Sequence, residues 1–397
     1  MKKKVIAAGH ICLDITPVFP EKTVLAVTDI LLPGKLIQMG DARIHTGGAV
    51  ANTGLAMKLL GADVSLMGKI GKDTFGEIIG SLLSKYDADA GMIRTDQAST
   101  SYSVVLAIPG IDRIFLHNPG ANDTFCAEDI PEEAWQDTAL FHFGYPPLMR
   151  SMYVNGGMET VRIMKKAKEM GCATSLDMAA VDSESDAGKA DWKEILRNTL
   201  PYVDFFVPSA EELCYMLDQE RFALWQERAK GGDITEILDV EEDIRPLAEQ
   251  CMSYGAKILL IKCGAAGMYY RTASEPVLSE VGKRAELDTA GWAGQEGFEA
   301  SYVPERVLSA AGAGDTSIAA FLTAMLDGYP LKNCLQLAAA TGASCVEVYD
   351  ALSGIKPFSK LQEKISAGWK KNGVQFNKRG MVLKNAVPCY FLLVSYE

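Results

Sequence analysis

Residues 309–325 read SAAGAGDTSIAAFLTAM, a run of very small residues followed by one carboxylate and an apolar pattern. The apolar residues recur at positions i, i+3, i+4 and i+7: Ile318, Phe321, Leu322 and Met325. This spacing predicts a helix that begins close to Asp315 and ends before Gly328. The first amides of a helix have no intrahelical acceptor, and small residues before them let an anion approach. The stretch therefore predicts an anion site at a helix N-terminus with a carboxylate beside it.

Asp315 also has a simpler interpretation as the N-cap of this helix, a position that Asp fills well. A cap alone does not require Gly312 and Gly314 before it, because glycine costs backbone entropy on folding. The residues by themselves leave both interpretations open.

A second glycine cluster occupies residues 47–76, GGAVANTGLAMKLLGADVSLMGKIGKDTFG. A glycine pair opens a predicted helix, Asn52 lies one turn inside it, and Gly61 ends it. Such a pair can also serve only to let a helix cross a sheet closely. The signatures of P-loop proteins, dinucleotide-binding dehydrogenases, zinc proteases and α/β hydrolases do not occur in the sequence.

Short β-branched runs alternate with longer amphipathic runs along most of the chain. Strands are predicted near 5–9, 64–68, 141–144, 174–178, 204–208 and 257–264, and helices near 49–60, 74–85, 157–170 and 244–254. This order predicts an α/β fold of three layers, with a mostly parallel central sheet between helices. We expect one domain across residues 1–397.

Several segments interrupt the alternation. Residues 36–46 and 101–117 read as extended chain, which predicts either a sheet edge or a flap over the main sheet. Residues 218–242 and 282–300 are interpreted as surface insertions. The C-terminal extension, 357–397, has no assigned role.

Composition excludes several classes of protein. The chain of 397 residues is 48% hydrophobic and carries a net charge of −12, so it can bury a large core and lacks the basic excess of a nucleic-acid surface. Nine cysteines without a C-x-x-C pair are typical of a reduced, cytoplasmic protein. The longest apolar run near the C-terminus, VPCYFLLV, is too short to span a membrane.

Taken together, the two glycine clusters resemble the signatures of the PfkB, or ribokinase-like, family of carbohydrate kinases, over about residues 5–350. The resemblance implies a ribokinase-like fold and transfer of the γ-phosphoryl group of ATP to a hydroxyl of a small sugar. It implies that Asp315 accepts the proton of that hydroxyl, and that the amides of Gly312, Ala313 and Gly314 form an anion hole for the phosphoryl group. Phosphoryl transfer depends mainly on positioning and charge stabilisation, which such groups can supply.

The family's substrate positions match Asp14, Gly47, Gly48 and Asn52, whereas Cys12 stands where a polar residue is frequent. Gly264 and Gly267, in KCGAAG, resemble the family's nucleotide loop, although a plain turn after a strand explains them equally well.

The family's N-x-x-E motif reads S-A-E-E here, so Glu212 is retained for Mg²⁺ and Ser209 replaces the asparagine near the nucleotide. Magnesium is expected, because phosphates and hard oxygen ligands bind it. Residues 307–310 lack the Asp-Thr pair that many members have near a monovalent cation, which argues against potassium activation.

The extended segments resemble the family's β lid, here about 12–46 and 98–120, which covers the sugar and through which family members form homodimers. Four basic residues lie on or near it: Arg43, Arg94, Arg113 and His117. They form a solvated face or, if they converge, a site for a phosphorylated sugar. Two alternatives to a sugar kinase stay open: a nucleoside kinase of the same fold, and a nucleotide-binding regulator without catalysis.

Overall fold

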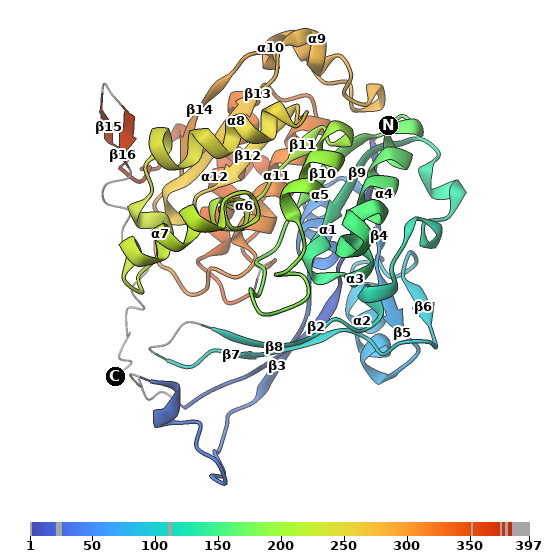
Figure 1. Cartoon of the computed structure of the whole chain (residues 1–397), viewed down its shortest axis with the longest axis vertical. Helices are drawn as coiled ribbons and strands as arrows, with labels where there is room; N and C mark the ends of the chain where they lie inside the picture. Colours follow the sequence, from blue (N-terminus) through green and yellow to red (C-terminus); the bar gives the residue numbers. More distant parts are fainter. Residues whose placement is uncertain are drawn as a thin grey trace.

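The computed structural model of the chain describes residues 2–20, 26–109, 113–350, 352–373, 375–377 and 380–382. Its main feature is an eight-stranded sheet in the middle of the molecule (Figure 1). In spatial order the strands are β14 (Glu296–Ala300), β13 (Gly267–Thr272), β12 (Ile258–Lys262), β11 (Phe205–Phe206), β10 (Ala173–Asp177), β9 (Thr138–Gly144), β1 (Lys4–Gly9) and β4 (Asp63–Met67). The strands from β12 to β4 are parallel, and β13 and β14 add an antiparallel edge.

Helices cover both faces of this sheet because successive strand residues point to opposite sides. Val5 and Ala7 pack into one core with α1 (Ala49–Leu59), α11 (Ala313–Leu326) and α12 (Leu331–Cys345). Ile6 and Ala8 pack into the other core with α4 (Met158–Glu169), α5 (Trp192–Thr199), α6 (Ala210–Leu217) and α8 (Arg245–Ser253). These layers confirm the predicted three-layer α/β class.

A second sheet of four strands, which we call the lid sheet, projects from one end of the molecule (Figure 1). In spatial order it contains β3 (Ala42–Gly47), β2 (Cys12–Pro17), β7 (Tyr102–Leu106) and β8 (Ile114–Asn118). One face packs on α2 (Thr74–Ser84), where the rings of Phe75 and Tyr102 lie 5.5 Å apart. The chain enters this sheet directly from β1, so the lid sheet starts beside the carboxyl ends of the central strands.

The remaining elements are short. They are α3 (Arg150–Tyr153), α7 (Gln219–Ala229), α9 (Glu275–Leu278), α10 (Thr289–Trp292), α13 (Phe358–Ser366), the pair β5 (Lys69–Gly71) and β6 (Ile93–Thr95), and the pair β15 (Gln375–Asn377) and β16 (Gly380–Val382). Within the described part of the chain, no helix has the length and apolar character needed to cross a membrane.

The two segments interpreted as surface insertions contribute to the interior. Trp225 of α7 and Trp292 of α10 are almost fully buried, and β14 pairs with β13 along its whole length. The sequence interpretation of 282–300 does not anticipate this edge strand. Beyond residue 357, α13 packs on α12, and Trp369 stacks on Tyr302 with 4.8 Å between ring centroids.

Candidate active site

Asp315 lies buried in the first turn of α11, where two side chains hold its carboxylate. Asn52 Nδ2 donates to Oδ2 at 3.0 Å, and the hydroxyl of Tyr145 donates to Oδ1 at 2.5 Å. The N-cap of the helix is Gly312, with φ +72°, and Asp315 is the third helical residue. The interpretation of Asp315 as an N-cap is therefore wrong: its carboxylate faces Asn52 and Tyr145, not the helix amides.

The amides expected to form an anion hole lie in this same first turn. The amide of Ala313 already donates to the carbonyl of Ala310 at 3.3 Å. Helix geometry leaves the next two amides, of Gly314 and Asp315, without an intrahelical acceptor. A Cβ at Gly314 would lie 3.3 Å from Cδ of Lys262, so only a small residue fits between the helix start and this lysine.

Lys262, at the end of β12, lies beside the helix start in a buried ion pair. Its Nζ is 2.7 and 2.9 Å from the two oxygens of Asp177, at the end of β10. Burial raises the pKa of Asp177 to about 7, although the charge of Lys262 opposes that shift. Burial alone would lower the pKa of Lys262, but Asp177, Glu212 and Asp315 raise it overall, so the lysine stays charged.

Burial likewise raises the pKa of Asp315, while the charge of Lys262 and the hydrogen bonds from Tyr145 and Asn52 work against this rise. Tyr145 follows β9 and has φ +70° and ψ +45°, a left-handed conformation that is rare outside glycine, asparagine and aspartate. Strained backbone of this kind persists where the surrounding structure holds it, often at functional sites. Sequence reasoning did not single out Tyr145, Lys262 or Asp177.

The residues expected to bind the sugar meet where the lid sheet joins the body. Cys12 Sγ donates to Asp14 Oδ1 at 3.3 Å. A Cβ at Gly47 would lie 2.3 Å from Asp14 Oδ2, and one at Gly48, with φ +86°, would lie 2.5 Å from the carbonyl of His10. Both positions therefore require glycine for packing. Asn52 lies one turn into α1, and its side chain links this part of the site to Asp315.

Ser209 and Glu212 form a capping box at the start of α6. The Glu212 amide donates to Ser209 Oγ at 3.2 Å, and the Ser209 amide donates to Glu212 Oε2 at 2.7 Å. The replacement of the family's asparagine thus has a structural role in addition to any contact with nucleotide. Glu212 also lies close enough to raise the pKa of Lys262.

Gly264 and Gly267 flank a single turn between β12 and β13, with φ +56° and +136°. A Cβ at Gly264 would lie 2.5 Å from Thr235 Oγ1, and one at Gly267 would lie 2.1 Å from the carbonyl of Glu299. Packing against β14 therefore accounts for Gly267. Gly264 faces the cavity described below.

The four basic residues near the lid do not converge. The guanidinium of Arg43 lies over the ring of Tyr349 at 4.6 Å, and that of Arg113 lies 6.0 Å from the ring of Phe115. Arg94 belongs to β6, next to Gly80 of α2. His117 Nδ1 lies 2.9 Å from Oγ of Ser103, its neighbour in the lid sheet.

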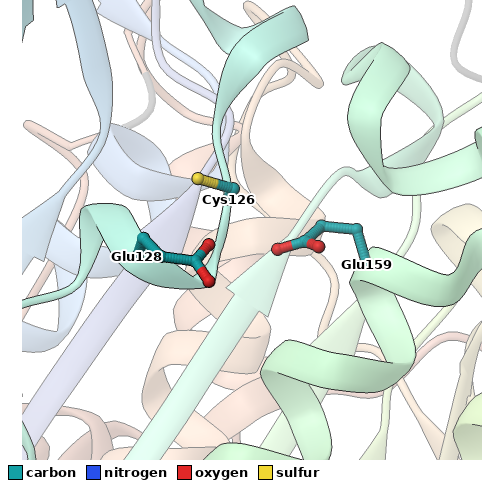
Figure 2. Close-up of side chains that lie close together, drawn as sticks. All are labelled: Cys126, Glu128 and Glu159. Atoms are coloured by element: carbon teal, nitrogen blue, oxygen red, sulfur yellow. The ribbon is translucent and has the colours of Figure 1, made fainter.

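One group with the spacing of metal ligands occurs in the described residues, and it lies away from Asp315. Figure 2 shows Cys126, Glu128 and Glu159 around a small space. Arg162 pairs with both glutamates, and its Nη2 lies 2.7 Å from Glu159 Oε1. A guanidinium therefore already neutralises these carboxylates, and the group does not form a metal site in this arrangement.

A cavity of about 1300 Å³ opens from Asp315 and continues along α6 and α7. Its lining includes Tyr145, Ser209, Glu212, Lys262, Gly264 and Gly314. This volume exceeds that of most pockets for small ligands. Of the predicted positions, Asp315, Gly314, Ser209, Gly264 and Glu212 line this one cavity, whereas Gly312, Ala313, Gly267 and the four predicted sugar positions do not.

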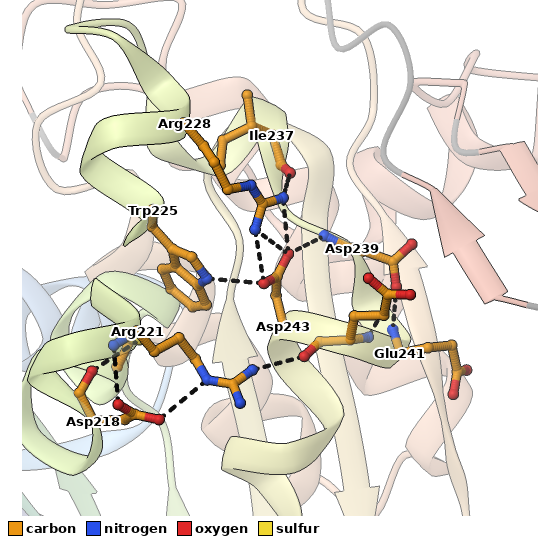
Figure 3. A network of polar contacts seen from close by, with 10 residues as sticks. Asp218, Arg221, Trp225, Arg228, Ile237, Asp239, Glu241 and Asp243 are labelled. Carbon is orange, nitrogen blue, oxygen red and sulfur yellow. Dashed lines mark hydrogen bonds and ion pairs between the residues drawn. The ribbon is translucent and has the colours of Figure 1, made fainter. Parts of the chain in front are cut away.

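One wall of this cavity, α7, is fixed by a buried carboxylate (Figure 3). Asp243 accepts from Trp225 Nε1 at 2.9 Å and from Arg228 Nη1 at 3.0 Å, and it also accepts from the amide of Asp239 at 2.8 Å. Trp225 and Arg228 lie on α7, so Asp243 connects this helix to the segment before α8. The position of the wall therefore depends on Asp243.

Comparison with known proteins agrees with this geometry. The model of the pfkB family of carbohydrate kinases matches residues 4–357. An uncharacterized sugar kinase of Archaeoglobus fulgidus is 22% identical over 301 residues, covering 76% of this chain and 98% of its own. A 5-dehydro-2-deoxygluconokinase of Clostridium perfringens is 23% identical, covering 91% of this chain and 94% of its own.

Among solved structures, the ribokinase of Arabidopsis thaliana in complex with ribose and ATP has a similar fold. The TM-score is 0.66 at 18% identity, covering 91% of this chain and 98% of that one. The family match extends over the central sheet, the lid sheet and the cavity, up to residue 357. The chain therefore belongs to the pfkB family of carbohydrate kinases.

Proposed function

We propose that this kinase transfers the γ-phosphoryl group of ATP to a hydroxyl of a small sugar, with Asp315 as the base. The proposal rests on one observation. The carboxylate of Asp315 is held in place at the start of α11, where a separate donor bonds each of its oxygens. A carboxylate with a raised pKa is a better proton acceptor than an exposed one. The fixed geometry aligns the acceptor hydroxyl with the phosphoryl group.

The helix start and Lys262 supply the positive charge that phosphoryl transfer requires. The amides of Gly314 and Asp315 lie at the positive, N-terminal end of the helix dipole, and Lys262 lies beside them. Together they stabilise the charge that develops on the phosphoryl oxygens. In this proposal ATP occupies the large cavity, with its phosphates near Gly314 and its remainder near Gly264 and Ser209.

Glu212 fits the role of a magnesium ligand through water. Its Oε2 accepts the Ser209 amide, and within the described residues its hydrogen bonds engage that oxygen alone. Asp177 suits this role less, because Lys262 contacts both of its oxygens. Bound Mg²⁺ would neutralise phosphate charge, and phosphates with one carboxylate are a common setting for it.

The test is the Asp315→Asn variant in an assay of acceptor-dependent ADP release. We expect turnover to fall about 10²–10⁴-fold, the usual contribution of a general base, while ATP still binds. Asp327→Asn is the matched control, because this exposed carboxylate lies at the other end of the same helix. Most of the turnover remaining in Asp315→Asn would show that the assigned role is wrong.

The acceptor panel contains pentoses, hexoses, keto-deoxy acids and nucleosides. If nucleosides are the only acceptors, the hypothesis of a nucleoside kinase replaces that of a sugar kinase. ATP binding without transfer to any member of the panel would favour a regulator without catalysis.

A further inference from the structure

His10 is a buried histidine whose ring has no hydrogen-bond partner in the described part of the protein. It lies between β1 and β2, and only 2% of its surface is exposed. Its amide donates to Gly144 and its carbonyl accepts from Val50, so the backbone is fixed on both sides. Neither Nδ1 nor Nε2 has a hydrogen bond within the described residues.

A buried polar group without a partner is costly, by about 1–3 kcal/mol for each group. A phenyl ring would fill the same space without this cost. The ring also constrains its neighbour, since a Cβ at Gly48 would lie 2.6 Å from Nδ1. A polar ligand next to the ring accounts for retaining both nitrogens at this position.

The lid sheet carries a row of polar side chains, one of which, His117, contacts this ring. Strand register aligns one residue from each of the four strands in the order His45, Asp14, Ser103 and His117. The ring of His117 lies 5.2 Å from that of His10, and the ring of Tyr145 lies 6.1 Å away on the body side. His10 and this row thus include three of the four histidines in the chain.

The charges around His10 favour a neutral ligand. Burial, and then the charge of His117, lower the pKa of His10 to about 3, so its imidazole is neutral and offers one donor and one acceptor. A hydroxyl group, which both donates and accepts, matches this pair. Asp14 stands in the same row as His117, whose ring contacts that of His10, and a carboxylate in this row disfavours an anionic ligand.

Guanidinium groups lie farther out. Arg43 pairs with Thr16, one row beyond Asp14, and its guanidinium contacts Tyr349. The histidines do not have the spacing of metal ligands, since the one such group in the described residues is that of Cys126. A metal ion therefore does not explain the cluster.

We propose that His10 binds a hydroxyl group of the acceptor and, together with the row His45, Asp14, Ser103 and His117, selects an uncharged sugar over a sugar acid or a phosphorylated sugar. This inference rests on the proposed function, because it places the acceptor between the lid sheet and Asp315. It adds a specificity residue and a substrate class to that function.

The first test compares matched acceptors: D-glucose with D-gluconate and glucose 6-phosphate, and D-fructose with fructose 1-phosphate and a keto-deoxy acid. We expect kcat/KM to be at least about 10-fold higher for the neutral members. In His10→Phe, which keeps a ring without nitrogens, we expect the acceptor KM to rise at least about 10-fold while the KM for ATP is unchanged. His142→Gln is the control, since His142 is buried on β9 and bonded to Ser175.

A second measurement separates this inference from the proposed function. Neutral sugars are expected to raise the melting temperature without ATP, and His10→Phe to abolish this shift. That result without any phosphoryl transfer would count against the proposed function alone. A preference for acids or phosphorylated sugars, the absence of any shift, or His10→Phe behaving as the wild type would overturn the inference.

Discussion

The hydroxyl of Tyr145 donates a 2.5 Å hydrogen bond to Oδ1 of Asp315 across 170 residues of sequence. Tyr145 adopts a left-handed backbone conformation to do so, directly after β9. Asn52 holds the other oxygen from α1. The orientation of the carboxylate therefore depends on α1 and on the residue directly after β9.

Tyr145→Phe removes one of these two donors and keeps the ring. A hydrogen bond to a charged group contributes about 1.5–3 kcal/mol, so we expect kcat to fall about 10–100-fold with a smaller change in the acceptor KM. Steady-state kinetics measures both quantities, and Tyr153→Phe serves as a control on a tyrosine that contacts Trp192 instead. An unchanged kcat would contradict a positioning role for Tyr145.

The pH dependence of kcat/KM should report Asp315. Burial raises the pKa of this carboxyl, so activity should fall, as pH decreases, at a higher pH than an ordinary aspartate would cause. The Tyr145 hydrogen bond favours the ionised form, and Tyr145→Phe should move this acidic limb to still higher pH. If the acidic limb of Tyr145→Phe stays at the wild-type pH, the titrating group is not Asp315.

Replacing Lys262 should lower the free energy of unfolding more than replacing Asp177, its ion-pair partner. Lys262→Met leaves the buried carboxylates of Asp177 and Asp315, and the half-buried one of Glu212, without their cation, and we expect a loss of about 3–5 kcal/mol. Asp177→Asn should cost less, because the other two carboxylates still face the lysine. At low pH, Asp177 becomes protonated and no longer needs a cation, so Lys262→Met should lose less stability there. Thermal unfolding at several pH values measures the stability of both variants. Equal losses of stability in Lys262→Met and Asp177→Asn would contradict the prediction.

Asp243→Ala should loosen the wall of the cavity formed by α7. It leaves the buried Trp225 indole and the amide of Asp239 without their acceptor, and we expect a loss of at least about 1–3 kcal/mol with a higher KM for ATP. Glu227→Ala, on the same helix, is the control. Lower stability with an unchanged KM for ATP would show that α7 does not shape the nucleotide site.

The apolar face of the lid sheet, which packs on α2 through Tyr102, should mediate a homodimer through its exposed residues. Register places Ile44, Ile15, Val104 and Leu116 in one row, and Ile44 and Leu116 are 42% and 54% exposed. Lysine at both exposed positions should give a monomer at concentrations where the wild type is dimeric, as measured by light scattering. Leu224→Lys, at an exposed position of α7, is the control. A monomeric wild type would exclude this dimer.

Local patterns were sufficient to predict the layers of the fold and the start of α11. Alternation of buried runs with amphipathic runs predicts β1, β9, β10 and β12, and helical spacing predicts α11. The edge strand β14, EGFEA, lacks such a pattern because it is only half-buried, and its pairing partner β13 lies across a long connection. Its identification required the sheet register.

The site was predictable only where its residues form a motif. Asp315 and Asn52 lie in glycine-rich clusters, whereas Tyr145, Asp177 and Lys262 are single residues at or just after strand ends. One signal was available, since side chains at the carboxyl ends of parallel strands meet at the same edge of a sheet. The unpaired ring of His10 depends on packing against Gly48 and on the distance to the lid, which sequence spacing does not encode.

The polar row and the residues proposed for phosphoryl transfer belong to different parts of the molecule. The lid sheet carries His45, Asp14, Ser103 and His117, whereas Asp315 and Lys262 belong to the body. Exchange of the lid strands between relatives should therefore alter acceptor choice while the chemistry persists. In this architecture, new substrates can evolve by changing a few exposed strand positions, without rebuilding the buried ion pair on which stability depends.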